Sequence, residues 1–315
     1  MRMSVASAGV FGPPLEAASL EGLVAVVTGA SRGLGLGLCR RFGQLGLRLG
    51  MCARHEPVPP DPPGPRGALC RAVDVTDPGE VERFALEVIG RFGRIDLWVN
   101  NAGVLEPIGP LADADPLAIR HLFEVDVGGV VHGTQAFCRH VRSRPGGGVL
   151  VNVTSGAAVT PYAGWAPYCA AKAAVDQLTR VIAVEEAANG LRALAVAPGL
   201  VDTDMQATIR ATPAERFPAV GRFLRAKAAG SFNSPGWVAD AVVELAFGAA
   251  APETVGQDVV VRVPDEPRHR HLQSRSEPPG ESGPHRGPER PGLPDPRGTP
   301  RPERGARWPG HDGVW

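Results

Sequence analysis

A short apolar run followed directly by a glycine-rich turn lies near the start of the chain and limits the folds open to it. Residues 23–28 are Leu-Val-Ala-Val-Val-Thr, and the turn Thr28-Gly29-Ala30-Ser31-Arg32-Gly33-Leu34-Gly35 leads into a stretch, 33–46, with a helical pattern. A β-branched run of this kind is typical of a strand buried in a parallel sheet. Glycines after such a strand allow a tight turn and let a pyrophosphate approach the N-terminus of the following helix. The segment therefore predicts a dinucleotide-binding strand–turn–helix unit.

The rest of the chain continues this alternation. Further strands fit residues 47–53, 68–73, 95–100, 148–154, 191–197 and 257–263, and helices fit about 165–188 and 236–248. Strands that alternate with helices favour a parallel sheet covered on both faces. We therefore predict an α/β fold, a Rossmann-like doubly wound parallel sheet of about seven strands, in a single domain over residues 21–263.

Three segments depart from this pattern. Residues 56–66 are too rich in proline for a helix and are expected to be extended. Residues 1–20 are predicted to be a flexible N-terminal segment. Residues 264–315 are rich in proline, arginine and glycine, which predicts a disordered tail, because such a segment cannot bury enough surface to offset its ordering entropy. We expect its removal from residue 264 onward to leave folding and activity intact.

The overall composition excludes several classes of partner. The formal net charge is zero, which gives no reason to expect a nucleic-acid or membrane-surface partner. No run of 18 apolar residues is present, so no membrane span is expected. Five cysteines without a C-x-x-C pair are interpreted as reduced thiols of a cytoplasmic protein, with no metal site.

Tyr168 and Lys172 form the strongest chemical signal. The chain has only two tyrosines and two lysines, so a pair at this spacing is expected by chance only about 0.01 times. A spacing of four places both side chains on one face of the predicted helix. Tyrosine can donate a proton to a ketone oxygen, and a nearby ammonium group lowers its high pKa. Ser155, at the end of the predicted strand 148–154, is a candidate to hold the carbonyl oxygen, or alternatively a cap of the strand end.

The end of the second predicted strand bears on the choice of cofactor. NAD-binding proteins usually place an acidic residue there, against the ribose 2′-hydroxyl. This chain has Cys52-Ala53-Arg54 instead, and Arg32 lies in the glycine-rich turn. Two guanidinium groups suit a 2′-phosphate, which favours NADP(H), although Arg54 is also compatible with an ordinary surface position.

Taken in order, these motifs resemble the short-chain dehydrogenase/reductase family over about residues 20–263. The resemblance rests on Thr28 to Gly35, Asp74-Val75, Asn100 to Gly103, Ser155 thirteen residues before Tyr168, Lys172, and Pro198-Gly199. It implies a catalytic group of Ser155, Tyr168 and Lys172, and a homodimer or homotetramer. It also implies cofactor contacts from Gly29, Ser31, Arg32, Gly33, Leu34, Gly35, Arg54, Asp74, Val75, Asn101, Ala102, Gly103, Tyr168, Lys172, Pro198, Gly199, Val201 and Thr203.

A narrower resemblance concerns the substrate. The stretches 151–156, 161–168 and 198–206 are similar to the benzil reductase and sepiapterin reductase subgroup. The subgroup implies reduction of a small-molecule carbonyl, an α-dicarbonyl above all, with Ser155, Trp165, Tyr168, Met205 and Gln206 at the substrate. Val260 stands where sepiapterin reductases have an acidic pterin anchor, which argues against a pterin substrate.

Asp126 departs from the family pattern. The family usually has asparagine at this position, where it helps to organise a water linked to the lysine, and this chain has Glu124-Val125-Asp126-Val127. We expect the carboxylate to pair with Lys172 and to alter the proton relay. Two alternatives to an NADPH-dependent carbonyl reductase stay open, namely a catalytically weak NADP-binding protein that acts through partners and an NAD-dependent alcohol dehydrogenase.

Overall fold

The strand predicted first forms the centre of the sheet. In the computed structural model, β2 (Val24–Thr28) is completely buried and pairs in parallel with β3 (Arg48–Ala53) on one side and β5 (Leu97–Asn100) on the other. The sheet continues through β4 (Ala68–Ala72), β6 (Gly148–Val153), β7 (Leu191–Ala197) and β8 (Val260–Arg262), and every pairing is parallel. The strand order is β1-β8-β7-β6-β5-β2-β3-β4. Along the chain, β3 and β4 are added on one side of β2, and β5 and the strands after it are added on the other side. Ligands of doubly wound sheets bind where the order switches sides in this way, here between β5 and β2.

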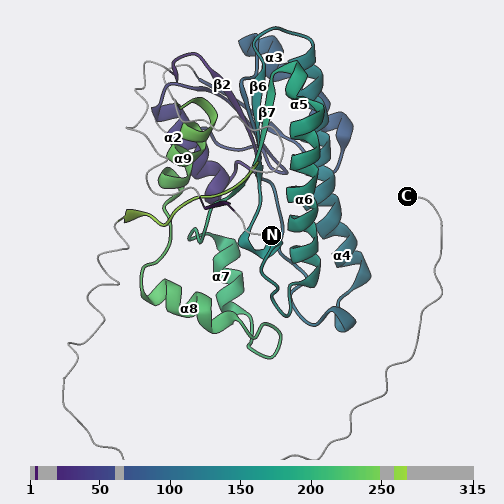
Figure 1. Ribbon diagram of the computed structural model, residues 1–315, viewed down its shortest axis with the longest axis vertical. Helices are drawn as coiled ribbons and strands as arrows, with labels where there is room; N and C mark the ends of the chain where they lie inside the picture. Colours follow the sequence, from purple (N-terminus) through teal and green to yellow (C-terminus); the bar gives the residue numbers. More distant parts are fainter. Residues whose placement is uncertain (1–3, 6–19, 61–66, 249–258, 268–315) are drawn as a thin grey trace, which may run out of the picture. The chain divides into compact units, whose positions relative to one another are not determined.

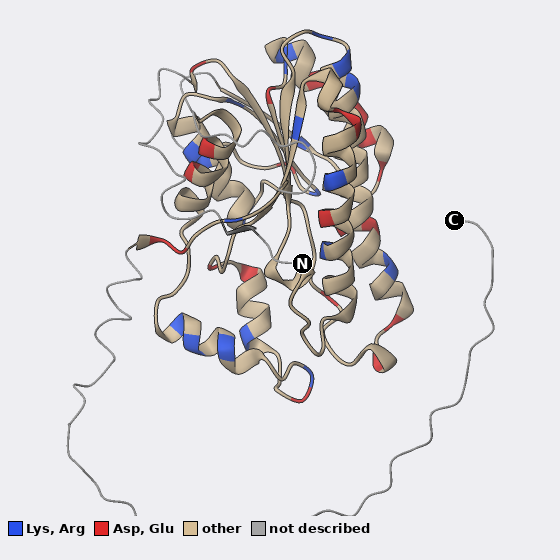
Figure 2. Ribbon diagram, in the orientation of Figure 1, with Lys and Arg blue, Asp and Glu red and all other residues tan. Residues whose placement is uncertain are grey.

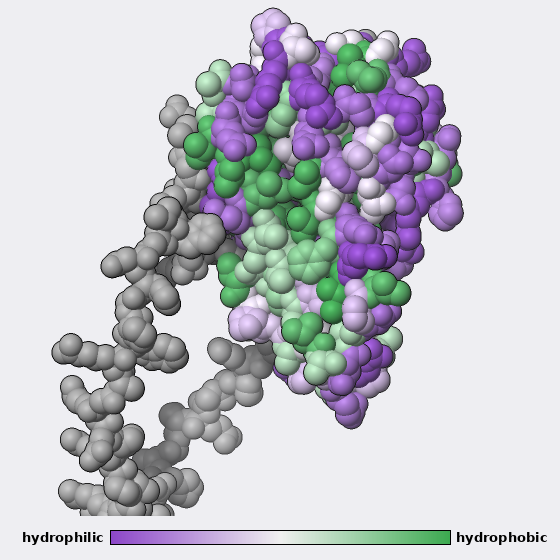
Figure 3. Space-filling model, turned by 90° about the vertical axis from the view of Figure 1, so that its right-hand side faces the viewer, coloured by the Kyte–Doolittle hydropathy of each residue, from purple (hydrophilic) through white to green (hydrophobic). Residues whose placement is uncertain are grey.

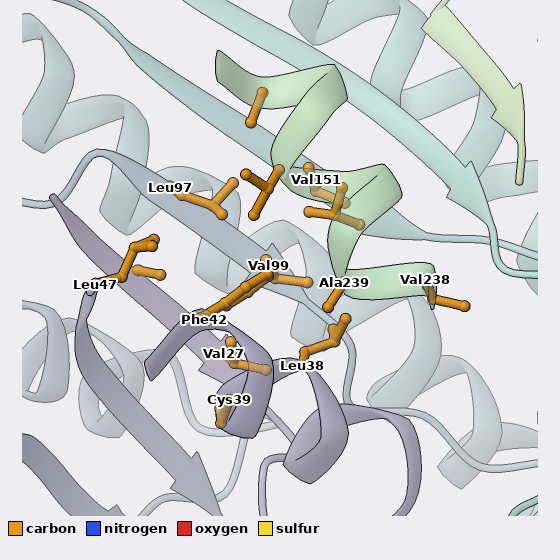
Figure 4. Packing of buried hydrophobic residues seen from close by; sticks show 14 of the residues in the cluster. Val27, Leu38, Cys39, Phe42, Leu47, Leu97, Val99, Val151, Val238 and Ala239 are labelled. Atoms are coloured by element: carbon orange, nitrogen blue, oxygen red, sulfur yellow. The ribbon is translucent and has the colours of Figure 1, made fainter. Parts of the chain in front are cut away.

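Helices cover both faces of this sheet (Figure 1). On one face lie α2 (Gly33–Gln44) and α9 (Pro235–Phe247), and on the other lie α3 (Pro78–Phe92), α5 (Gly129–Arg142) and α6 (Ala166–Glu185). Successive residues of β2 point to opposite faces of the sheet. Val27 belongs to the hydrophobic core that contains Leu38 and Val238, and Val26 belongs to the core formed with side chains of α3 and α5. Figure 4 shows the first of these two cores, where Phe42 of α2 meets residues of the sheet and of α9.

Three shorter helices complete the fold. α4 (Pro116–Phe123) continues through a π-helical turn η2 (Glu124–Gly128) directly into α5. α7 (Asp204–Ala211) and α8 (Val220–Ala228) follow β7 and pack against each other beyond the sheet, in the lower part of Figure 1. Short 3₁₀ turns occur at Leu111–Asp113, Gly156–Ala158 and Ala187–Asn189. No helix in the described part of the chain is long and apolar enough to span a membrane.

The structure describes residues 4–5, 20–60, 67–248 and 259–267, all within one compact unit, Met1–Ser276. All seven predicted strands are present, which confirms the doubly wound fold. The flexible segment predicted over 1–20 is partly wrong, because β1 (Ser4–Val5) pairs in parallel with β8, whose outer edge offers free hydrogen-bonding groups. Residues 56–60 form no helix, as predicted, and 61–66 lie outside the described residues.

The predicted boundary of the C-terminal tail is also wrong by a few residues. The described chain continues to residue 267, and Pro264 and Glu266 form hydrogen bonds with the start of α9. We name residues 264–267 the C-terminal strap. Residues 268–315 of the predicted tail lie outside the described residues.

Candidate active site

Tyr168 and Lys172 lie one turn apart on the buried side of α6. Tyr168 is 7% exposed and Lys172 is 6% exposed, although lysine is rarely buried. The Lys172 ammonium donates to the Val153 carbonyl oxygen over 3.3 Å and lies 5.6 Å from the centroid of the Tyr168 ring. The spacing of four residues therefore brings the two groups together as predicted.

Ser155 follows β6 and begins the 3₁₀ turn Gly156–Ala158. Its Oγ accepts a hydrogen bond from the Ala157 backbone N–H over 3.2 Å and also lies in hydrogen-bonding contact with the Tyr168 hydroxyl. The serine thus caps a turn and contacts the tyrosine at the same time. The capping role considered from the sequence is confirmed, and the contact of Ser155 with a substrate carbonyl oxygen stays a prediction.

Asp126 lies in the π-helical turn η2 and is fully buried. Its Oδ2 is 3.0 Å from the Lys172 Nζ, and its Oδ1 accepts a hydrogen bond of 2.7 Å from the Val104 backbone N–H. The two charges therefore form a close ion pair in the interior of the protein. A π-helical turn re-aims side chains within a helix and is frequent at functional sites. The expected pairing of Asp126 with Lys172 is confirmed.

The environment of Tyr168 raises its pKa above the ordinary value of tyrosine. Burial is the main cause, the Lys172 ammonium opposes it, the Asp126 carboxylate adds to it, and the hydrogen bond with Ser155 opposes it. The Lys172 ammonium does lower the pKa of Tyr168, as expected from the sequence, but burial and the Asp126 carboxylate outweigh it. Tyr168 holds its proton at neutral pH.

The pKa of Lys172 also lies above its ordinary value. Burial alone would lower it, but the charges of Asp126, Tyr168 and Asp176 together outweigh burial. Asp176 lies one turn after Lys172, is buried, and accepts a hydrogen bond from the Thr154 hydroxyl. Burial raises the pKa of Asp176 as well. The sequence analysis missed this second carboxylate, although its spacing of four from Lys172 could have identified it.

An aromatic cluster adjoins Tyr168, and we define it as Tyr162, Trp165, Phe217 and Phe223. Trp165 meets the Tyr168 ring edge-on, with centroids 5.6 Å apart, and stacks on Phe217 at 4.3 Å. Met205 packs against the same hydrophobic core, and Gln206 is buried on the inner side of α7. The structure thus brings Trp165 and Met205 into the surroundings of Tyr168, as predicted for the substrate site.

Helix α8 borders the aromatic cluster and is basic. Arg222, Arg225 and Lys227 give it the row of positive charges seen in Figure 2. Arg222 donates a hydrogen bond of 2.6 Å to the Tyr162 hydroxyl. Lys227 and Arg210 both pair with Asp202, which follows β7. These contacts tie α7 and α8 to the loop that leads out of the sheet.

The glycine-rich turn fits a pyrophosphate. Gly29 and Gly33 have positive φ angles, and a Cβ on Gly29 would lie 2.8 Å from the Ala102 Cα, too close for any other residue. The start of α2, which follows this turn, has no side-chain cap and no acidic residue in its first turn. Free N–H groups with the positive end of a helix dipole suit an anion. The residues present therefore fit a dinucleotide.

The loop after β5 is fastened to this turn. The Thr28 hydroxyl accepts hydrogen bonds from the Asn101 and Ala102 backbone N–H groups at 3.0 and 3.1 Å. The Asn101 side chain donates to the Thr28 and Gly29 carbonyl oxygens, and Gly35 leaves room for it. Asn101 thus acts by holding two loops together. Asn100 lies deeper, hydrogen-bonded to Asn152 at 2.9 Å and to the Trp98 indole at 2.7 Å.

Arg32, Arg54 and Asp74 lie at the adenosine end expected from the sequence. The Arg54 side chain is exposed after β3, close enough to Asp74 to act on its charge. Hydrogen bonds from Thr76, aided by Arg54, hold the pKa of Asp74 below its ordinary value. Arg32 pairs with Asp204 of α7 at 3.2 Å, and both side chains are 73% exposed. Such an exposed pair is weak and leaves Arg32 available to a phosphate.

The loop after β7 is held by a residue that the sequence analysis did not identify. Asn233 is buried, and its side chain donates to the Pro198 carbonyl oxygen over 2.9 Å and accepts from the Glu266 backbone N–H over 2.9 Å. Its backbone N–H donates to Leu200, and Thr203 approaches the open face of Gly33. No local pattern signals this role, because it depends on segments that are more than thirty residues away in sequence.

The chain is similar to known proteins in sequence and in fold. The family model described as short chain dehydrogenase matches residues 23–214. A cis-4-hydroxycyclohexanecarboxylate dehydrogenase of Sinomonas cyclohexanicum is 38% identical over 236 residues, which cover 72% of this chain and 90% of that protein. A benzil reductase ((S)-benzoin forming) of Saccharomyces cerevisiae is 34% identical over 205 residues, covering 61% of this chain and 76% of that protein.

Solved structures agree with the sequence relatives. The KRED1-Pglu enzyme superposes with a TM-score of 0.67 at 31% identity, covering 76% of this chain and all of that one. A 3-ketoacyl-(acyl-carrier-protein) reductase from Brucella melitensis, complexed with NADH, has a TM-score of 0.67 at 26% identity and covers 78% and 97%. The chain therefore belongs to the short-chain dehydrogenase/reductase family of oxidoreductases, which use a nicotinamide cofactor, and it resembles the benzil reductases within that family.

Proposed function

We propose that this protein is an NADPH-dependent carbonyl reductase that acts on a ketone, with α-dicarbonyl compounds such as benzil-like diketones as its preferred class. The observation that carries the proposal is the buried Tyr168, which lies one helical turn from Lys172 and interacts with Ser155. Ketone reduction needs a proton donor at the oxygen, and a protonated tyrosine is that donor. Similarity to benzil reductases supports the choice of substrate class.

The roles of the polar residues follow from their contacts. A bound nicotinamide cofactor supplies hydride to the carbonyl carbon. Ser155 orients the carbonyl oxygen by a hydrogen bond, and Tyr168 donates its proton to that oxygen. Lys172 stabilises the tyrosinate that remains and binds the nicotinamide ribose. Asp126 keeps Lys172 charged and fixes the Val104 backbone after β5.

The preference for NADPH rests on the two arginines and on the missing acid. Residue 54, at the carboxyl end of β3, is an exposed arginine, and Arg32 of the glycine-rich turn is equally accessible. Arginine binds phosphate through paired hydrogen bonds. The remaining cofactor contacts are proposed for Gly29, Ser31, Gly33, Leu34 and Gly35, for Asp74 and Val75, for the loop 101–103, and for Pro198, Gly199, Val201 and Thr203.

A second candidate is alcohol oxidation with NAD. It is favoured by the relatives named cis-4-hydroxycyclohexanecarboxylate dehydrogenase and L-fucose dehydrogenase, the latter 31% identical over 244 residues. Oxidation needs tyrosinate as the base, and the raised pKa of Tyr168 opposes its formation at neutral pH. We therefore rank reduction first.

Assembly and location belong to the same proposal. We propose a homodimer or homotetramer, because the outer side of α6 exposes Ala166, Ala170, Ala173, Val181 and Val184. Figure 3, which faces the right-hand side of Figure 1, shows hydrophobic residues gathered in a band on this side of the molecule. The five free cysteine thiols support the proposed cytoplasmic location.

Cofactor oxidation provides the test. We expect kcat/KM for a diketone such as benzil to be at least tenfold higher with NADPH than with NADH, and Arg54→Ala to reduce that preference. Tyr168→Phe should lose nearly all turnover and keep NADPH binding, because the ring packs as before and only the proton donor is lost. Equal rates with both cofactors would refute the NADPH assignment. A wild type that reduces no diketone but oxidises an alcohol with NAD would favour the second candidate.

A further inference from the structure

Two buried polar atoms in the region around Tyr168 have no hydrogen-bond partner among the residues that the structure describes. They are the Trp165 indole Nε1 and the Gln206 Oε1. Trp165 is 4% exposed and Gln206 is 9% exposed, so bulk solvent does not satisfy either group. A buried polar atom without a partner is costly, and one in a native protein calls for an explanation.

Both groups belong to the surroundings of the proposed proton donor. Trp165 lies three residues before Tyr168, on the same side of the start of α6, and the two rings meet edge-on. Gln206 lies three residues before Ile209 on the buried side of α7, and Ile209 belongs to the same hydrophobic core as Trp165 and Tyr168. An unpaired donor and an unpaired acceptor therefore lie in the core that the substrate must reach.

The neighbours of Trp165 give its N–H little else to bond. The indole stacks on Phe217, and Phe223 and Tyr162 lie with ring centroids 5.5 and 5.1 Å from it. The Tyr162 hydroxyl is already bonded to Arg222. A water molecule needs two to four polar partners, and aromatic walls do not provide them. An acceptor atom carried by a substrate that is itself largely apolar fits this position better.

We propose that the Trp165 N–H donates a hydrogen bond to a second oxygen of the substrate, next to the carbonyl that is reduced. Ser155 and Tyr168 engage the reacting oxygen, so Trp165 selects substrates with an adjacent oxygen, α-diketones and α-hydroxyketones, over ketones with a single oxygen. This assignment rests on the proposed reductase function and adds to it the residue that determines specificity.

The test compares two substrates that differ by the second oxygen. 1-Phenylpropane-1,2-dione and 1-phenylpropan-1-one share the phenyl ring and a carbonyl, and the ratio of their kcat/KM values reports recognition of the second oxygen. We expect Trp165→Phe to lower the ratio of the two kcat/KM values, dione over monoketone, by about 10- to 100-fold. Any general packing defect lowers both values and leaves the ratio unchanged.

A replacement of nearly the same shape tests the role of the N–H separately from that of the ring. Benzothienylalanine at position 165 keeps the bicyclic shape and has sulfur in place of the indole N–H, and it should give the same loss of ratio. Its thermal midpoint should match that of the wild type, because no protein partner is lost. The same replacement at Trp237, whose Nε1 donates to the Pro264 carbonyl oxygen over 2.8 Å, should lower the midpoint and leave the ratio intact.

The outcomes distinguish this inference from the function on which it rests. A ratio unchanged in both Trp165 variants overturns the inference and leaves the reductase function standing. A ratio that falls only in Gln206→Met assigns the second oxygen to the Gln206 side-chain amide N–H and overturns the role of Trp165. A wild type that reduces neither compound, or none of a wider set of diketones, overturns the proposed function as well.

Discussion

At the scale of single residues, the buried ion pair of Asp126 and Lys172 is the feature of the candidate active site that bears most on the proposed proton transfer. Two charges taken out of water are stable only together, and removing one partner of such a pair costs about 3–5 kcal/mol. Asp126 also accepts the Val104 N–H, so one carboxylate joins the lysine to the loop after β5. The same charge raises the pKa of Tyr168.

Asp126→Asn is expected to shift the pH profile of reduction to lower pH. The amide keeps an acceptor for Val104 but removes the charge that raises the pKa of Tyr168. Reduction needs protonated Tyr168 and declines as pH rises through its pKa, so the alkaline limb of kcat/KM should fall earlier in the variant. The other groups that act on the tyrosine are Lys172, Ser155 and Cys169, and the substitution replaces none of them.

Asp176→Asn is the matched control for this prediction. Asp176 acts on Lys172 from the same helix, but it is not among the groups that act on Tyr168. Its removal should leave the alkaline limb in place. Pre-steady-state reduction rates measured against pH for the wild type and both variants decide the matter. Superimposable profiles for the wild type and Asp126→Asn would mean that the carboxylate does not act on the tyrosine.

At the scale of elements, close packing between α2 and α9 depends on a missing side chain. A Cβ on Gly37 would overlap with the Cβ of Pro235 at the start of α9, which is backbone-anchored and cannot swing away. Gly90, exposed in the last turn of α3, has nothing within 4 Å of the same position. We therefore expect alanine to change the stability of the fold in opposite directions at these two positions.

Gly37→Ala should destabilise the fold by about 1–3 kcal/mol, because overpacking forces the helices apart. Gly90→Ala should stabilise it by up to about 1 kcal/mol, because alanine is the better helix former. Urea unfolding followed by circular dichroism measures both. Equal effects in the two variants would show that helix propensity alone is at work and that α2 and α9 tolerate the extra methyl group.

The second prediction at the scale of elements concerns the C-terminal strap, residues 264–267. Chains ending at Val263 and at Pro267 differ by the hydrogen bonds that Pro264 and Glu266 make with Asn233, Ser234 and Trp237. At about 1 kcal/mol for each bond, the shorter chain should be less stable by roughly 3–4 kcal/mol. It should also bind the cofactor more weakly, since Asn233 holds Pro198. Identical unfolding curves for the two chains would refute this role of the strap.

Elements with a local signal were predictable, and those defined by distant contacts were not. The strands at β2, β3 and β5 show in the sequence because a strand buried on both faces must be apolar throughout. The pairing of Tyr168 with Lys172 follows from helical spacing alone. Asn233, the strap and the raised pKa of Tyr168 depend on segments brought together by folding, and the sequence carries no local pattern for them.

At the scale of the whole molecule, the exposed apolar side of α6 predicts self-association. Val181 and Val184 are 43% and 62% exposed on the same side of the helix as Ala166, Ala170 and Ala173. Small residues let two helices approach closely, and a twofold axis would pair this surface with its own copy. The band of hydrophobic residues in Figure 3 is consistent with such a contact.

Glutamate at both Val181 and Val184 should therefore convert the assembly to monomers. Native mass spectrometry and sedimentation velocity report the change directly. Val58→Glu, at an even more exposed valine after β3, is the control and should leave the assembly unchanged. A wild type that sediments as a monomer at micromolar concentration would contradict the prediction.

Both tyrosines of the chain contact the Trp165 ring in this fold, Tyr162 within the aromatic cluster and Tyr168 against it. Protein grown with 3-fluorotyrosine would therefore give a ¹⁹F NMR spectrum of two resonances, both arising at the proposed substrate site. Tyr162, bonded to an arginine, and Tyr168, buried, differ enough in environment to separate, and one Tyr162→Phe sample assigns them. Ligand binding and proton loss could then be observed at the proton donor itself, in an otherwise unmodified chain.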